Sequence, residues 1–390
     1  MVKLVNTLHS GCSELKLLEV RVFSWAQAIR LITGFFCLYT MRIALLHTNP
    51  YYQEIEDLIL DIVSHPKNKD LQFFEFHSAD FKWFRIHRLL QLRSFLKKNN
   101  IDIIHTYHYH EAFYALMAAK GLGIKVVYSS YFYHDDLKAC YKWMFEYVLK
   151  NVDSIIFQSD VHKDRVIAQY KLNPERHFKL YHGFSPYRFD NFCYNSLRDE
   201  LFIDDFKFVI GSHGDFTPEH GLMNIMKMIK KLRKTGRNFV CLLSGEQNDE
   251  NDAYFNDCKY YYLLQGLDNY INFIGRRYDI ANYMSQLDVF LYHSDNETVA
   301  LPVMQALIAG ANVVANDNEM IREICSGGKY ATLYKSDDID DFAEKTRMVL
   351  NDIEEFQLIA ETVQEECRII FGIDRHIAGL IDVYSKVKKY

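Results

Sequence analysis

The side chains best suited to chemistry lie where a predicted strand, Val289–Tyr292, meets a predicted helix that begins at Thr298. Residues 293–297 read HSDNE, so residue types that favour helix N-caps precede an acid that complements the positive helix end. Unpaired backbone N–H groups at such an end suit phosphate oxygens. The pattern therefore predicts an anion-binding site that comprises Ser294 and the N–H groups near Thr298, Val299 and Ala300.

One longer polar side chain directly precedes this predicted helix and another stands on it. Glu297 and Gln305 are eight positions apart (297 to 305), a little over two helical turns, so both can contact one elongated ligand. The simplest alternative is that Glu297 only caps the helix. A cap does not require the residue pattern that surrounds it, so we favour a role in ligand binding.

These residues belong to a chain in which short apolar runs alternate with helical patterns from Met41 onward. Such alternation is typical of parallel sheets covered on both faces. The apolar pattern is interrupted between Ser185 and Asp205, which indicates a domain boundary. We therefore predict an α/β fold with two doubly wound, Rossmann-like domains that face a cleft, with ligands at the carboxyl ends of the strands. The predicted strands span 43–47, 71–76, 101–106, 125–129, 154–158 and 178–181, then 208–212, 239–244, 271–274, 289–292 and 312–315.

The segment 294–323 resembles the signature of retaining GT-B enzymes of glycosyltransferase family 4. That signature is a Ser shortly before a Glu, seven residues, a second Glu, a small-residue helix end, a Val-Val strand and a later Glu. Ser294, Glu297, the helix end 306–310, Val313-Val314 and Glu323 stand at these places, with Gln305 at the second Glu. Weaker matches extend the resemblance over most of 41–390, at 101–105, 152–159, 181–184 and 371–384.

The resemblance implies a domain plan and a division of roles. Residues 1–40 would form an N-terminal extension, 41–190 an acceptor-side domain, 191–370 a donor-binding domain, and 371–390 a closing helix that returns to the first domain. Glu297 would contact hydroxyls of the transferred sugar, and Gln305 would hold the ribose of the nucleotide. No metal and no other cofactor is expected.

The other donor element of the family departs from its pattern here. In the family a Gly-Arg pair, a short loop and a Lys-Gly pair hold the donor diphosphate. In this chain Gly214 is followed by Asp215 in the Arg place, and His220 stands in the Lys place. A carboxylate repels a diphosphate, and losing such a clamp costs transition-state stabilisation on the order of 3 kcal/mol.

Three explanations of this departure remain open. The donor carries less phosphate charge, as a nucleoside monophosphate sugar does; other cations, Arg276 and Arg277, replace the clamp; or the protein binds without transferring a sugar. A solvated helix start is the simpler interpretation of the two arginines.

The first domain offers histidines at predicted strand ends. The family often has a Gly-rich loop after the first strand, but the sequence that follows His47 has no glycine near it. His47, His105 and His108 are expected on the acceptor side, and the spacing of His105 and His108 does not match a metal-binding motif. The family commonly has a His after the fourth strand, where this chain has Tyr131, and His134 is a candidate catalytic stand-in.

Two segments could contact a membrane surface. Residues 81–98, from Phe81 to Lys98, contain six Lys or Arg and no acid, and a solvated basic face is the alternative. Residues 22–39 are largely apolar but are interrupted by Gln27 and Arg30. They are consistent with a membrane-surface helix, a packing extension, or sequence upstream of the true start.

Composition excludes several classes of protein. Of the 390 residues, 49% are hydrophobic and 25% charged, as in globular domains, and the net charge of −6 argues against a nucleic-acid binder. The eight cysteines are scattered, with no metal-binding or disulfide spacing, which favours a reducing, cytoplasmic setting.

The sequence thus predicts a cytoplasmic, metal-independent hexosyltransferase that acts on a saccharide or lipid-linked acceptor with retention of configuration. Its substrate partner would be a nucleotide-sugar donor. The alternative is a non-catalytic GT-B subunit that binds a partner transferase or a glycan, and a nucleotide-sugar epimerase is a third class.

Overall fold

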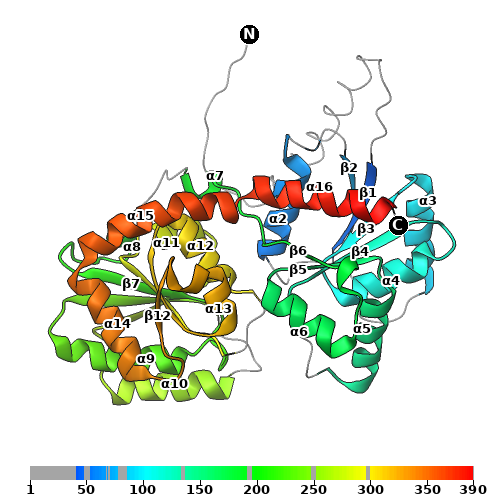
Figure 1. The fold of residues 1–390 in the computed structure, drawn as a ribbon. Coiled ribbons are helices and arrows are strands. Elements are labelled where there is room, and N and C mark those ends of the chain that lie inside the picture. Colours follow the sequence, from blue (N-terminus) through cyan, green and yellow to red (C-terminus); the bar gives the residue numbers. More distant parts are fainter. Residues whose placement is uncertain are drawn as a thin grey trace, which may run out of the picture. The chain divides into compact units, whose positions relative to one another are not determined.

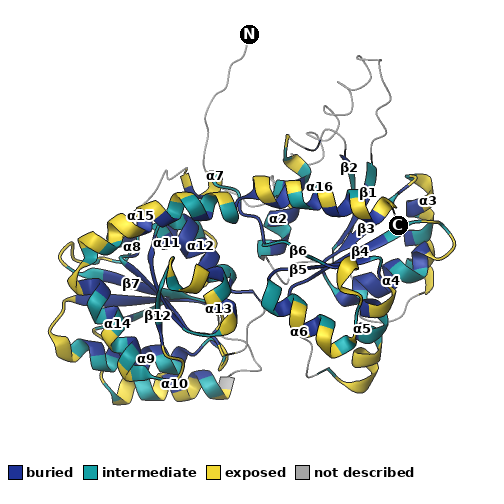
Figure 2. Cartoon of the chain, in the orientation of Figure 1, coloured by how far each residue is buried: buried dark blue, intermediate teal, exposed yellow. Residues whose placement is uncertain are grey.

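The computed structural model describes residues 41–47, 53–66, 68, 71–77, 86–132, 137–190, 196–246, 252–295 and 299–389. The compact unit Met41–Tyr390 contains two parallel six-stranded sheets with helices packed against them (Figure 1). The residues of both sheets are predominantly buried (Figure 2), as expected for strands covered on both faces. The predicted α/β class with two doubly wound halves is confirmed.

The first sheet has the strand order β2-β1-β3-β4-β5-β6, and every pairing is parallel. The helices that connect its strands pack against the sheet, and the apolar residues on their inner faces form the core. The strands are β1 (Met41–His47), β2 (Leu71–His77), β3 (Ile103–Thr106), β4 (Lys125–Ser130), β5 (Ser154–Phe157) and β6 (Phe178–Lys179). The helices are α2 (Gln53–Ser64), α3 (Ile86–Lys98), α4 (Tyr109–Ala119), α5 (Ala139–Asn151) and α6 (Asp160–Tyr170).

The second sheet has the order β12-β11-β10-β7-β8-β9, with its direction of winding reversed between β7 and β10. In open α/β sheets, ligands bind outside the carboxyl ends of the strands at such a reversal. The strands are β7 (Phe208–His213), β8 (Phe239–Ser244), β9 (Ile271–Gly275), β10 (Val289–Tyr292), β11 (Asn312–Asn316) and β12 (Thr332–Tyr334). The helices are α7 (Tyr187–Asp190) and α8 (Leu197–Glu200) in the connection, then α9 (Leu222–Leu232), α10 (Asp252–Leu264), α11 (Ile280–Ser285), α12 (Leu301–Ala309), α13 (Glu319–Ile324) and α14 (Ile339–Asn351).

All eleven predicted strands are present, with ends that differ by at most two residues, and β12 was not predicted. The predicted start of the helix after β10 is wrong. Helix α12 begins at Leu301 and its N-cap is Ala300, whose own side chain makes no cap hydrogen bond. Pro302 lies in the first turn, where its fixed φ favours helix initiation, so the start moves downstream of the polar residues.

Two final helices connect the halves. α15 (Ile353–Ile370) packs on α12, and α16 (Ile373–Lys389) lies beside α2 of the first half (Figure 1). Backbone bonds hold the turn between them, because Phe184 N–H donates to Phe371 O at 2.8 Å and Ile373 N–H donates to Phe184 O at 2.9 Å. One apolar cluster accordingly runs from β1 through α16 to β10 and α12.

A bilayer-spanning helix would need a long, almost uncharged apolar run, and no helix within the described residues has one.

Candidate functional site

A cavity of about 720 Å³ lies at the reversal point of the second sheet, and α2 and the segment 182–189 form its opposite wall. Loops after β7, β8, β9 and β10 supply the donor-side wall. The volume falls in the range of small-molecule sites in proteins. The cavity brings together seven of the predicted donor-binding residues: Gly214, Asp215, His220, Arg276, Ser294, Val299 and Gln305.

The loop after β7 is shaped by glycines. Gly214 has φ of 153°, in the region that favours glycine, and its N–H donates to Ser244 O at 3.1 Å. A side chain at Gly245 would meet Gly214 O at 2.0 Å, so two glycines allow the backbones to lie against each other. Gly221, with φ of 58°, is the N-cap of α9. The loop is therefore a defined turn at the sheet edge, although its family cations are absent.

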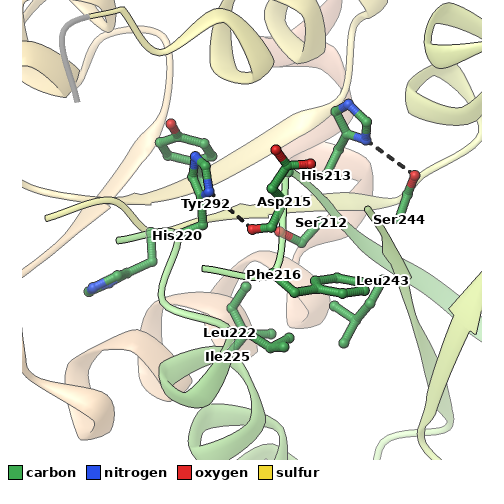
Figure 3. Close-up of a pocket in the computed structure, with 12 residues that line it drawn as sticks. Ser212, His213, Asp215, Phe216, His220, Leu222, Ile225, Leu243, Ser244 and Tyr292 are labelled. Atoms are coloured by element: carbon green, nitrogen blue, oxygen red, sulfur yellow. Dashed lines mark hydrogen bonds between the residues drawn. The ribbon is translucent and has the colours of Figure 1, made fainter. Parts of the chain in front are cut away.

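Histidines of this loop bond within the protein. His220 Nδ1 lies 3.0 Å from Asp215 O and 3.1 Å from Thr217 Oγ1, so the imidazole donates a bond into its own loop. His213 Nδ1 lies 3.2 Å from Ser244 Oγ (Figure 3). Burial, with smaller effects from His220 and Arg276, lowers the pKa of His213 to about 4, so this imidazole is neutral at pH 7. Neither histidine provides the fixed positive charge of the family clamp.

A small hollow of about 20 Å³ lies beneath the loop, with room for about one water molecule (Figure 3). The buried hydroxyl of Tyr292, at the end of β10, lines it and has no hydrogen-bond partner among the described residues. The hollow is polar on one side and apolar on the other, because Leu222, Ile225 and Leu243 complete its lining. It is too small for a sugar or a phosphate.

The two arginines after β9 have different surroundings. The guanidinium of Arg277 is held at 2.7–3.1 Å by both carboxylate oxygens of Glu200 and of Asp279, and its side chain is 12% exposed. Arg276 is 40% exposed and lies 3.4 Å from Glu246, itself 51% exposed. Exposed ion pairs of this kind contribute little to the stability of the fold. Arg276 is therefore the cation that can turn to an anion in the cavity, whereas Arg277 has a structural role.

The segment after β10 lies at the edge of the cavity. Ser294 is buried, and its backbone is fixed by Asn316, whose amide accepts from Ser294 N–H at 3.0 Å and donates to Ser294 O at 2.8 Å. Gln305 is 9% exposed and lines the cavity. Ala300 is fully buried and does not line it. Glu297 and Thr298 lie outside the described residues.

The predicted acceptor-side histidines do not line the cavity. His105 is fully buried, with Nδ1 2.6 Å from Tyr384 Oη and Nε2 2.8 Å from Ser129 Oγ, and burial lowers its pKa to about 3. It connects β3 to α16, so an acceptor cannot reach it. His108 caps α4 by accepting from His110 N–H at 3.2 Å, and His47 lies 3.7 Å from Glu75 at the end of β1. His134 lies outside the described residues.

Tyr131, named above at the place of the family's His, lines the first-domain wall together with side chains that sequence analysis missed. Tyr131 Oη lies 3.0 Å from His182 Nδ1, and both residues line the cavity although each is 2% exposed. Helix α2 contributes the carboxyl groups of Glu54, Asp57 and Asp61. Their spacing of three and four residues on one helical face was visible in the sequence. What the sequence did not show is that this face lines a cavity instead of facing solvent.

Glu323, matched in sequence to the later Glu of the family signature, connects the two halves. Its carboxylate accepts from the N–H groups of Asp160 and Val161, both at 2.9 Å, at the start of α6. Tyr181 Oη donates to the same carboxylate at 3.0 Å, and Lys179 Nζ lies 3.3 Å away. A side chain of α13 thus caps a helix of the first half.

One group of side chains in the described region has metal-ligand types within 4.8 Å of one another: His293, Asp295 and Asp337. Both ring nitrogens of His293 already have partners, because Nδ1 lies 2.7 Å from Tyr334 Oη and Nε2 lies 3.0 Å from Asn224 Nδ2. A metal would have to displace these bonds, so the group fits a structural network. Metal independence stays a prediction.

Two Rossmann-like halves with a cavity between them define the GT-B architecture, and family models match both halves. The model for glycosyltransferase family 4 matches residues 54–188, and the model for group 1 glycosyl transferases matches residues 194–365. The chain is similar to the group 1 glycosyltransferases in its second half and to family 4 in its first half, and it is a glycosyltransferase enzyme. The predicted resemblance to a group 1 or family 4 glycosyltransferase is confirmed. Retention of configuration and the altered diphosphate loop stay predictions.

Solved structures share the fold at low sequence identity. A glycosyltransferase from Rickettsia africae ESF-5 has a TM-score of 0.75 at 15% identity, over 90% of this chain and 99% of that chain. Anabaena HepE, solved with UDP and glucose, has a TM-score of 0.75 at 16% identity, over 89% and 100%. Sucrose-phosphate synthase from Thermosynechococcus elongatus has a TM-score of 0.72 at 12% identity, over 89% and 99%. No sequence among curated proteins matches this chain.

Proposed function

We propose that the protein transfers a hexose from a nucleotide-sugar donor to a saccharide or lipid-linked saccharide acceptor. The observation that carries this proposal is the cavity at the β7–β10 reversal, where seven predicted donor-binding residues converge on one space. Binding of UDP and glucose by Anabaena HepE, a protein of the same fold, supports a nucleotide sugar as donor.

In the proposed complex the donor lies along the second-domain wall. Gln305 bonds the ribose, Ser294 and the backbone near Val299 contact phosphate, and Arg276 supplies the charge that Asp215 and His220 do not. Glu297 orients the transferred sugar. The leaving phosphate accepts the acceptor's hydroxyl proton, which requires no protein nucleophile, no metal and no cofactor, and gives retention at the anomeric carbon.

The proposed setting is the cytoplasm, with contact to an anionic membrane through α3. The outer face of this helix exposes Ile86 and Leu90 beside Lys97 and Lys98, a combination that suits a lipid headgroup region. A lipid-linked acceptor would be reached from such a surface.

The proposal is tested by titrating the protein with UDP, ADP, GDP, CMP and their common sugar conjugates by calorimetry. One nucleotide should bind in the micromolar to millimolar range, and Gln305→Ala should weaken it about tenfold. Glu297→Ala should abolish transfer while leaving nucleotide binding within a few-fold. Absence of binding by every nucleotide would reject the proposed hexose transfer from a nucleotide sugar and favour the alternative, a subunit that binds a partner transferase or a glycan.

A further inference from the structure

The wall of the cavity opposite the donor-side loops has its own chemistry. Helix α2 turns Glu54, Asp57 and Asp61 toward the cavity, one helical turn apart, with Ile55 and Leu58 between them. Aromatic rings from the loop after β4 and from the segment that connects the two sheets complete this wall: Phe132, Phe184 and Phe189. Carboxylates therefore alternate with apolar surface.

Among the described residues of this wall, three carboxyl groups accompany one guanidinium group. Arg188 is its one arginine among the described lining residues, and its Nη1 lies 2.7 Å from Asp57 while its Nη2 lies 3.3 Å from Asp61. Both guanidinium arms are thus occupied, and within the described residues no cation lies within ion-pair distance of Glu54. Burial raises the pKa of this carboxyl group, and Arg276 acts on it more weakly in the opposite direction. His182 adds no charge, because burial holds the pKa of its ring well below the usual range.

Negative charge here decides which substrate can lie against the wall. A phosphate or carboxylate would meet a wall whose described residues include more carboxyl groups than cations, across a partly desolvated space where like charges repel more strongly than in water. The donor, whose phosphates are anionic, is therefore confined to the opposite wall near Arg276. Hydroxyl groups, by contrast, donate to carboxylates, and such charge-assisted bonds are stronger than neutral ones.

We propose that this wall is the acceptor subsite and that it takes a hydroxyl-rich sugar ring carrying no negative charge. Glu54 accepts hydroxyl donors of that ring, and the ring's apolar face packs on the phenylalanines. The subsite discriminates against uronic acids and phosphorylated sugars. This inference rests on the proposed function, because it assigns the second substrate of the same cavity.

The test measures sugar binding directly by saturation-transfer difference NMR on the full chain, with the nucleotide that binds best held at saturation. The probes are methyl glucoside and methyl galactoside, compared with glucuronic acid, galacturonic acid, glucose 6-phosphate and galactose 6-phosphate. At least one neutral glycoside should bind ten times or more tightly than the anions of the same configuration. Equal or tighter binding of the anions, or binding of none of the sugars, overturns the inference.

A pair of variants on α2 assigns the effect to the wall. Glu54→Gln should weaken the neutral glycoside about fivefold or more, since an amide accepts hydroxyl bonds less strongly than a carboxylate. Glu56→Gln is the matched control, because Glu56 lies on the same helix and does not line the cavity. Equal effects of the two changes would contradict the assignment to Glu54.

Nucleotide affinity separates the two proposals. It should stay within twofold in Glu54→Gln, because the donor lies on the opposite wall. Loss of all nucleotide binding by the unaltered chain would reject the proposed function and this inference with it. Retained nucleotide binding with preference for anionic sugars would reject the acceptor subsite alone.

Discussion

At the scale of single residues, the loop after β7 sets the charge that a donor meets. By the resemblance to family 4, Asp215 and His220 occupy the places of two cations, and His220 already donates to Asp215 O. Replacing both, Asp215→Arg with His220→Lys, should tighten binding of a nucleoside diphosphate about tenfold, because two charge-assisted contacts replace one repulsive group. Calorimetric titration measures this, and Asp205→Arg, at an exposed site away from the cavity, controls for net charge.

The two adjacent arginines should separate binding from stability. Arg276→Gln should weaken nucleotide binding about tenfold with little change in the free energy of unfolding, because its pair with Glu246 is exposed. Arg277→Gln should cost about 2 kcal/mol of stability, since Glu200 and Asp279 lose their charged partner. Urea denaturation and nucleotide titration of both variants check this, and a reversed pattern would reject the assigned roles.

At the scale of elements, Glu323 is a cap that one half of the protein provides for the other. Glu323→Ala should destabilise the protein by about 1–2 kcal/mol, because the first N–H groups of α6 and the hydroxyl of Tyr181 lose their acceptor. Glu319→Ala is the control, since that side chain is exposed on the same helix. Urea denaturation of the two variants measures the difference, and equal stability would show that the cap is dispensable.

Helix α3 is the element predicted to contact a membrane, and the structure shows which of its cations are exposed for such contact. Arg93 donates to Ala118 O at 2.7 Å and Lys120 O at 2.8 Å, so it secures the end of α4. Lys97 and Lys98 are exposed. Changing both to Glu should lower flotation with vesicles rich in anionic lipid about fivefold or more, since each cation near such a surface contributes about 1 kcal/mol. Equal flotation, or loss of binding only with Arg93→Gln, would contradict a surface role for these lysines.

For the molecule as a whole, sequence patterns determined more of the fold than of the site. Apolar strands such as Val289–Tyr292 are recognisable because burial on both faces requires continuous apolar residues. The start of α12 was misplaced because Pro302 outweighed the polar cap residues upstream. His105 was assigned to the acceptor although it is a buried link to Tyr384, a residue 279 positions away (105 to 384), and local sequence cannot reveal such a partner. The carboxylates of α2 were missed for the same reason.

Buried neutral histidines make the stability of the whole molecule depend on pH. Burial lowers the pKa of His105 to about 3 and the pKa values of His177, His213 and His376 to about 4. The unfolded chain binds protons at these sites near pH 6.5 and the folded chain does not, so stability is present above pH 6.5 and falls as the pH drops toward 4. Carboxyl groups with raised pKa values, Glu54, Asp61 and Asp288, oppose this fall in part.

Urea denaturation at pH 7.5, 6.5, 5.5 and 5.0 should therefore show falling stability, with each histidine contributing up to about 1 kcal/mol per pH unit below pH 6. His376→Gln should flatten the slope by one histidine's share while retaining a donor for Tyr181 O, the carbonyl that His376 Nδ1 meets at 2.6 Å. His87→Gln, at an exposed position of α3, should leave the slope unchanged. A slope that His376→Gln does not alter would mean that this ring is protonated in the folded protein, in conflict with its burial between α16 and the backbone of Tyr181 and Gly183.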